Sequence, residues 1–123
     1  MTGKKLFALR GATQCLNRRE DVSKQVAALY DELLAANKLA EGDIVSVFFS
    51  VTGDLDAQNP AAALRQSGRG GDLALFALRE ADISGSPEGI IRILIHCYLD
   101  GDAVPRHVYR NGAEILRPDR SCP

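Results

Sequence analysis

Four short stretches of the chain are rich in apolar residues, and in one of them these alternate with polar residues, a pattern typical of half-buried β-strands. The alternation lies over 43–51, where two sets of side chains are expected to face opposite ways. The apolar set is Val45, Val47, Phe49 and Val51, and the polar set includes Ser46 and Ser50. Strands are predicted over 5–14, 43–51, 72–78 and 89–99.

Two stretches have the character of helices instead. Residues 19–39 carry an apolar stripe that recurs at the helical period, with charged residues away from it. The stripe consists of Val22, Val26, Leu29 and Leu33. A short helix is predicted over 58–68, because Asn59 is a favoured N-cap residue, Pro60 suits the first helical position and Gly68 ends the pattern.

Asn111-Gly112 predicts a two-residue hairpin near the end of the chain. Type I′ turns need positive φ at both central positions, which this pair tolerates. The flanking strands would be centred on 108–109 and 115–116, the second ending on Arg117 and Pro118. The predicted order is β-α-β-α-β-β-β-β, a mixed α/β or α+β single domain covering 1–123.

Composition narrows the range of partners. The net charge of −1 provides no bulk attraction to nucleic acid or to acidic membranes, and neither is expected as a partner. The longest apolar run, over 90–99, is far short of a membrane span, and no signal peptide is expected. Three widely spaced cysteines (Cys15, Cys97 and Cys122) fit a reducing cytoplasm better than a disulfide framework.

Standard catalytic motifs are absent from the sequence. The glycine-rich segment SGRGGD (67–72) lacks the lysine and hydroxyl of a phosphate-binding loop and is interpreted as a flexible loop. His96 and Cys97 are adjacent, so in a strand they point to opposite faces and are poorly placed to share a metal. No metal site is predicted.

Arginines stand where strands should be apolar. Arg92 lies inside the run IIRILI, Arg10 and Arg117 each follow an apolar run, and Arg65 lies on the short helix. A shielded guanidinium needs an anion or several acceptors, because it stays charged. Each arginine alone could reach water or pair with a structural carboxylate. Together they could form a pocket for a small polycarboxylate, with Glu80 as the one well-placed acid.

These positions carry a family resemblance over nearly the whole chain. The matching segments are LRGATQ (9–14), SVTGDLDAQNPAAALRQ (50–66), READISGS (79–86), IIRILI (90–95), RHVY (106–109) and LRPDRS (116–121). The chain resembles the monofunctional, trimeric class of chorismate mutases. The resemblance implies a small α+β domain, three copies of which surround a central barrel-like sheet with active sites between neighbours. It also implies the isomerisation of chorismate to prephenate on the way to phenylalanine and tyrosine.

The resemblance also implies roles for individual residues. Arg10, with Tyr109, would bind a substrate carboxylate, Arg92 would contact the breaking ether oxygen, and Glu80 would contact the ring hydroxyl. The entrance of the pocket and its wall strand would be formed by Arg65, Arg117, Leu116, Leu75 and Phe76. Three positions depart from the family pattern: Asn59, Ala62 and Ala77 replace a phenylalanine, a lysine and a cysteine around the pocket.

This reaction would explain the missing motifs, because a pericyclic rearrangement needs no nucleophile, metal or cofactor. Fixed guanidiniums would hold the flexible dianion in its compact conformer and stabilise the charge that develops as the C–O bond lengthens. Two alternatives stay open. One is an imine or enamine deaminase of the same trimeric architecture, and the other is a non-catalytic metabolite-binding trimer descended from a mutase.

Overall fold

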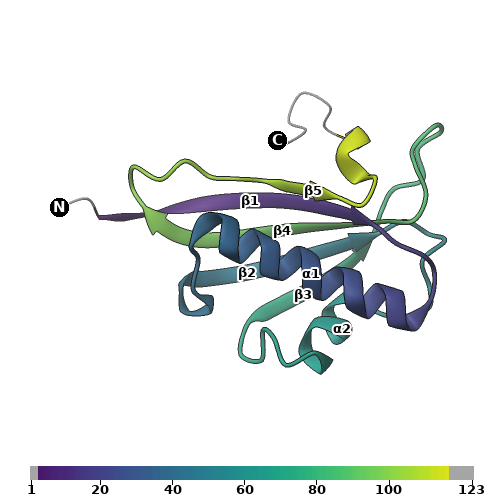
Figure 1. Ribbon diagram of the computed structural model, residues 1–123, viewed down its shortest axis with the longest axis horizontal. Coiled ribbons are helices and arrows are strands. Elements are labelled where there is room, and N and C mark those ends of the chain that lie inside the picture. Colours follow the sequence, from purple (N-terminus) through teal and green to yellow (C-terminus); the bar gives the residue numbers. More distant parts are fainter. Residues whose placement is uncertain (1–2, 117–123) are drawn as a thin grey trace.

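Five strands form one mixed sheet in the computed structural model, which describes residues 3–116 (Figure 1). The strands are β1 (Lys4–Gln14), β2 (Ile44–Val51), β3 (Ala74–Arg79), β4 (Ile90–Asp100) and β5 (Val108–Arg110). Their order across the sheet is β3-β2-β4-β1-β5. β4 runs antiparallel to both of its neighbours, whereas the two outer pairs, β2–β3 and β1–β5, are parallel. The four strands predicted from the apolar stretches are confirmed.

The two predicted helices are also confirmed, as α1 (Arg19–Asn37) and α2 (Pro60–Gln66). Asn59 caps α2, because its side-chain oxygen accepts hydrogen bonds from the backbone N–H groups of Ala61 at 2.8 Å and Ala62 at 3.3 Å. α1 ends at Lys38, which adopts a left-handed conformation with φ 49°. No described helix is long and apolar enough to cross a membrane.

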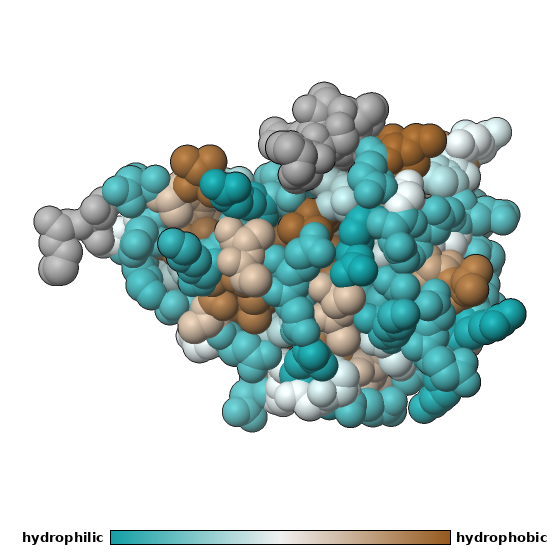
Figure 2. Space-filling view, in the orientation of Figure 1, coloured by the Kyte–Doolittle hydropathy of each residue, from teal (hydrophilic) through white to brown (hydrophobic). Residues whose placement is uncertain are grey.

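Both helices lie against the same face of the sheet, here called the helix-covered face (Figure 1). The predicted stripe of α1 is buried there against alternate residues of the strands. The strand residues that close this core are Leu9, Val47, Phe49, Ile91, Ile93, Ile95 and Cys97. Viewed from the helix side, the molecule presents a mostly hydrophilic surface to solvent (Figure 2).

The opposite face of the sheet is here called the open face, and within residues 3–116 no helix packs over its centre. It carries the remaining strand residues, several of them large and apolar. Leu6, Phe76, Leu78 and Tyr98 are between 43% and 57% exposed. Exposed apolar groups of this size on one sheet face are typical of an interaction surface.

The predicted faces of β2 needed one correction. Val45 does not share the buried face of Val47 and Phe49 but is exposed. The pairing of β2 with β4 shifts its register between Ile44 and Ser46, and this β-bulge places Ile44 in the core in place of Val45.

The predicted closing hairpin was wrong in its second half. Asn111 and Gly112 both have positive φ (59° and 99°), as the turn prediction required. The chain then forms a 3₁₀-helix, η2 (Ala113–Leu116), because β5 already has β1 as its parallel neighbour and the fully buried Ala113 packs against β1 and β4. Arg117 lies outside the described residues.

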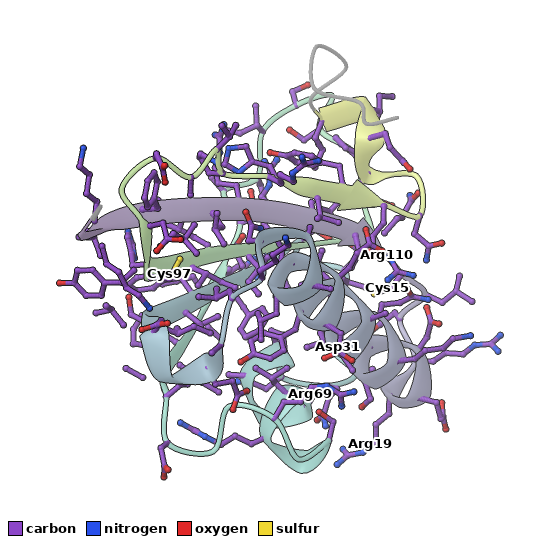
Figure 3. The ribbon with its side chains drawn as sticks, turned by 60° about the vertical axis from the view of Figure 1, so that its left-hand side comes forward. Cys15, Arg19, Asp31, Arg69, Cys97 and Arg110 are labelled. Atoms are coloured by element: carbon purple, nitrogen blue, oxygen red, sulfur yellow. The ribbon has the colours of Figure 1, made fainter. Side chains whose placement is uncertain are left out.

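The glycine-rich loop 67–72 is held against α1, which differs from the predicted flexible loop. Both Arg69 and Asp31 are labelled in Figure 3, where Arg69 reaches from the loop toward Asp31 on α1. The guanidinium contacts both carboxylate oxygens at 2.7 Å. Glu41, in the short helix η1 (Glu41–Asp43), accepts a hydrogen bond from the Gly70 N–H at 2.9 Å and another from the Tyr30 hydroxyl.

Candidate active site

A cleft of about 440 Å³ opens on the open face, at the end of the sheet where β1, β2, β4 and β5 come together. Alternation positions its side chains, because every second residue of β1, β2 and β4 points to this face. Polar groups and apolar groups both line it. They include Arg10, Phe48, Ser50, Leu78, Arg92, Leu94 and Tyr109.

Two arginines enter the cleft from neighbouring antiparallel strands. Arg10 of β1 pairs in register with Leu94 of β4, and Arg92 lies two residues along β4 on the same face. Within residues 3–116, the Arg10 guanidinium has no ion-pair partner. A pair of guanidiniums in one apolar-walled cleft favours an anionic ligand with more than one carboxylate.

Arg92 is held by Glu80. Its Nε lies 2.9 Å from Glu80 Oε1, with the arginine side chain 45% exposed and the glutamate 23% exposed. The Ser50 hydroxyl donates a hydrogen bond of 2.5 Å to the same oxygen. Glu80 follows directly after β3, and its backbone N–H donates to Val51 O at 2.8 Å, so its main chain is fixed to β2.

Tyr109 reaches the cleft from β5, where it pairs in register with Ala12 of β1. Gly11 permits this close approach, since a Cβ there would lie 2.9 Å from Val108 O and 3.0 Å from Leu33 Cδ1. The imidazole of His107 fixes β1 from the same side, with its Nδ1 accepting a hydrogen bond from the Arg10 N–H at 3.0 Å. Three of the residues predicted for the site, Arg10, Arg92 and Tyr109, therefore line one cleft.

η2 packs against β1 and β4, although none of its residues lines the cleft. Ala113 of η2 is buried with Ala12 and Ile90, and both Tyr109 and Leu116 pack against this group. Leu116 thus lies next to β4, the strand that carries Arg92, but outside the lining of the cleft.

A second group of predicted site residues does not reach this cleft within one chain. Leu75 and Ala77 pack against the core on the helix-covered face. Arg65, on α2, donates to Leu73 O at 3.3 Å. The remaining two are Asn59, which caps α2, and Phe76, which is exposed on β3. These five residues lie on α2 and β3, at or near the β3 edge of the sheet.

Sequence reasoning missed Phe48 and Ser50 as cleft residues. Ser50 was assigned to the polar set of its strand, and its position between the predicted site strands could have identified it. Phe48 lies on the same face and makes edge-to-face contacts with Phe76 and His96, at centroid distances of 6.1 and 5.9 Å. The alternation places Phe48 with Ser46 and Ser50, opposite the core residue Phe49, and a large aromatic residue in that polar set was the signal that could have identified it.

The thiols of Cys15 and Cys97 and the imidazole of His96 do not line the cleft, and Cys122 lies outside the described residues. His96 Nδ1 lies 3.2 Å from the Ser46 hydroxyl on the open face. Cys97, labelled in Figure 3, is buried on the helix-covered face, so the predicted opposite orientations are confirmed. Burial, followed by the charge of Asp43, raises the pKa of Cys97. Burial also raises the pKa of Cys15 to about 11. Within residues 3–116, no group of three or more His, Cys, Asp or Glu side chains is arranged to hold a metal ion.

The loop after β2 is tied to the start of β4, beside Glu80. Asp54 accepts hydrogen bonds from the Gly89 N–H at 3.0 and 3.2 Å, and Thr52 Oγ1 accepts one from the Ile90 N–H at 3.0 Å. Burial alone would raise the pKa of Asp54, but the hydrogen bonds from Thr52 and Gly89 outweigh it and lower that pKa. These bonds fix the ends of the two strands that flank the Arg92–Glu80 pair.

Comparison with known proteins identifies the family. The family model described as chorismate mutase type I matches residues 6–120. The chain is 30% identical to chorismate mutase AroH of Bacillus subtilis over 118 residues, covering 92% of this chain and 91% of that protein. It is 35% identical to chorismate mutase AroH of Thermus thermophilus, covering 90% of this chain and 95% of that protein.

A solved structure agrees with these matches. The chorismate mutase from Clostridium thermocellum superimposes with a TM-score of 0.81 at 38% sequence identity, covering 89% of this chain and 99% of that one. Sequence and fold agree over nearly the full length of the relatives. The chain therefore belongs to the chorismate mutase type I family.

Proposed function

We propose that the cleft on the open face is where this chorismate mutase isomerises chorismate to prephenate. The observation that carries the proposal is the placement of Arg10, Arg92 and Tyr109 around one cleft, with Glu80 paired to Arg92 through Nε. Chorismate carries two carboxylates, and the described cleft provides two guanidiniums against one carboxylate. The described site therefore has a net positive charge, which attracts an anionic substrate.

The reaction requires the protein to orient the substrate and to stabilise the charge that develops in the transition state. Arg10 and Tyr109 bind the side-chain carboxylate, which holds the substrate in the conformer whose bond-forming carbons meet. Arg92 presents its guanidinium to the ether oxygen, where negative charge grows as the C–O bond lengthens. Glu80 accepts a hydrogen bond from the ring hydroxyl and balances positive charge on the ring. No proton transfer or covalent intermediate is needed.

The complete site forms between neighbouring copies in a homotrimer. The β3 edge of one chain carries Asn59, Arg65, Leu75, Phe76 and Ala77, which do not reach that chain's own cleft. The exposed apolar groups of the open face suit burial against another copy around a central barrel-like sheet. A neighbour's β3 edge would then complete the cleft, with Leu116 and Arg117 at its entrance.

Three further features belong to this proposal. Residues 1–123 form one chorismate mutase domain whose reaction requires no cofactor, and its product lies on the route to phenylalanine and tyrosine. The enzyme acts in the cytoplasm, which the free, buried thiols of Cys15 and Cys97 support. Chorismate is its small-molecule partner.

The direct test is conversion of chorismate by purified protein after exhaustive treatment with a chelator. Loss of chorismate and appearance of prephenate are expected at unchanged rate, with heat-unfolded protein as the blank. Binding of chorismate by calorimetry without turnover would contradict the proposal and favour a non-catalytic metabolite-binding trimer. Loss of activity on chelation would contradict the mechanism alone.

A further inference from the structure

Ser50 lies between the two charged residues of the proposed site. In β2 it pairs in register with Arg92 of β4 on one side and with Leu78 of β3 on the other. Leu78 precedes Glu80 by two residues in the chain. Its side chain faces the cleft, and its hydroxyl donates to Glu80 Oε1 at 2.5 Å. Sequence analysis assigned this serine only to the polar face of a strand.

The hydroxyl and Arg92 share a single oxygen of the carboxylate. Arg92 Nε lies 2.9 Å from Glu80 Oε1, and within residues 3–116 the terminal nitrogens of Arg92 make no hydrogen bond to either oxygen of Glu80. When no other group restrains them, an arginine and a carboxylate favour a bidentate pair with two parallel N–H···O bonds. Such a pair would use the second carboxylate oxygen and a terminal nitrogen of the guanidinium.

We propose that Ser50 is a positioning residue that keeps the Arg92–Glu80 pair at one contact, so that the free oxygen and the free guanidinium nitrogens face the substrate. Two contacts hold the carboxylate, from the Ser50 hydroxyl and from Arg92 Nε, while the Glu80 N–H bond to Val51 O fixes the main chain of the glutamate. Removal of the hydroxyl lets the carboxylate rotate onto the end of the guanidinium. This inference rests on the proposed roles of Arg92 and Glu80.

The first test is kinetic. Ser50→Ala should lower kcat about tenfold, the usual scale for one hydrogen bond to a charged group, while KM changes by less than about twofold. Ser50→Thr keeps the hydroxyl on a β-branched side chain that suits a strand and should restore kcat to within about threefold of wild type. Ser46→Ala, on the same face but bonded to His96 outside the cleft, is the matched control and should match wild type.

Coupling to Glu80 separates this inference from the proposed function. Ser50→Ala should have no further effect on kcat in a Glu80→Ala background, because the hydroxyl acts through that carboxylate. A strongly impaired Glu80→Ala beside a fully active Ser50→Ala would overturn the role of Ser50 and leave the proposed site standing. A fully active Glu80→Ala would overturn the site assignment itself.

A structural readout does not depend on activity. A crystal structure of Ser50→Ala should show two parallel N–H···O hydrogen bonds between the Arg92 guanidinium and Glu80, a bidentate pair that is not present with serine. An unchanged single contact in that variant would overturn the inference, whatever the kinetics of the wild-type enzyme.

Discussion

The two faces of the sheet are built from alternate residues of the same strands, yet they differ in almost every other respect. On the helix-covered face, residues such as Ile95 and Phe49 are fully buried and belong to the same core as the apolar stripe of α1. On the open face, Arg10, Ser50 and Arg92 share a cleft with apolar groups that stay partly exposed. Residues adjacent in the chain can therefore serve stability and chemistry separately.

The difference has an energetic basis. Closing an isoleucine side chain from water contributes about 1.5–3 kcal/mol to folding, and the helix-covered face gathers many such residues. Charged groups add little to stability when they are partly exposed, as the pair of Arg92 and Glu80 is. The open face can thus carry charges chosen for a ligand, provided that another surface covers its apolar part. Substitutions on the two faces should separate these roles.

The largest effect is expected from a charge placed on the apolar part of the open face. Leu6→Glu, four residues from Arg10 on the same strand, should prevent assembly and reduce activity to a small residue, because an unpaired buried charge costs about 3–5 kcal/mol at each interface. Light scattering and chorismate turnover provide the measurement. Val104→Glu, in the loop between β4 and β5, is the exposed apolar control and should stay assembled. A fully active monomer would contradict the shared site.

The next effect is confined to the helix-covered face. Ile95→Ala should lower the free energy of unfolding by about 2–5 kcal/mol, because it leaves a cavity in a closed core. Ile95→Val, which removes one methylene, should cost about 0.5–1.5 kcal/mol. Urea denaturation of the two variants gives both values. Equal, negligible losses would mean that this face does not carry the stability of the fold.

A smaller effect is expected at the edge of the proposed shared site. Ala62→Lys, on α2, should lower KM about fivefold with little change in kcat, since an added peripheral cation attracts the dianion in its ground state and transition state alike. Ala62→Glu should raise KM by a similar factor. Steady-state kinetics at low and moderate salt would show both effects shrinking as salt increases. A gain confined to kcat would place residue 62 near the reacting bond.

The smallest effect is expected in the reactivity of the buried thiol of Cys15, which directly follows β1. The pKa of Cys15 is raised to about 11 by burial and then by the charges of Asp21 and Asp54, so the folded protein holds almost no thiolate there at pH 8. Cys15 should resist iodoacetamide in the folded state and react after unfolding in urea, as read by mass spectrometry of the peptide. Modification at the rate of a free thiol in native protein would show that this region opens readily.

Local pattern was enough to predict most of the fold. Apolar stretches identified four strands, the apolar stripe identified α1, and Asn59 with Pro60 identified the start of α2, because these signals depend on neighbours in the chain. The prediction of a second hairpin strand was wrong because it depended on a distant contact. Ala113 lies in a 3₁₀-helix because β5 pairs with β1, a contact between distant segments that no local signal reports. The predicted burial of Val45 was wrong for a similar reason, because a bulge in the pairing of β2 with β4 places this residue on the surface.

The site was predictable only in part. Arg92 stood out because a charge interrupts an apolar strand, and the family resemblance assigned its partners. The contact of Ser50 with Glu80 depends on the order of strands β2, β3 and β4, which the sequence does not state. The separation of Arg65 from the cleft of its own chain likewise follows from the placement of α2 on the opposite face. Such facts belong to tertiary structure.

The most direct test of the central claim, that the open face carries chemistry and the other face stability, is Arg92→Leu. Its kcat and melting temperature should be measured on the same sample, with Arg92→Lys as the variant that keeps the charge. Loss of a well-placed donor to a developing oxyanion should lower kcat by about two to three orders of magnitude, while the melting temperature stays at or above that of wild type. Arg92→Lys should also be poor, because an ammonium does not reproduce the planar guanidinium. A folded Arg92→Leu enzyme with wild-type kcat would contradict the account.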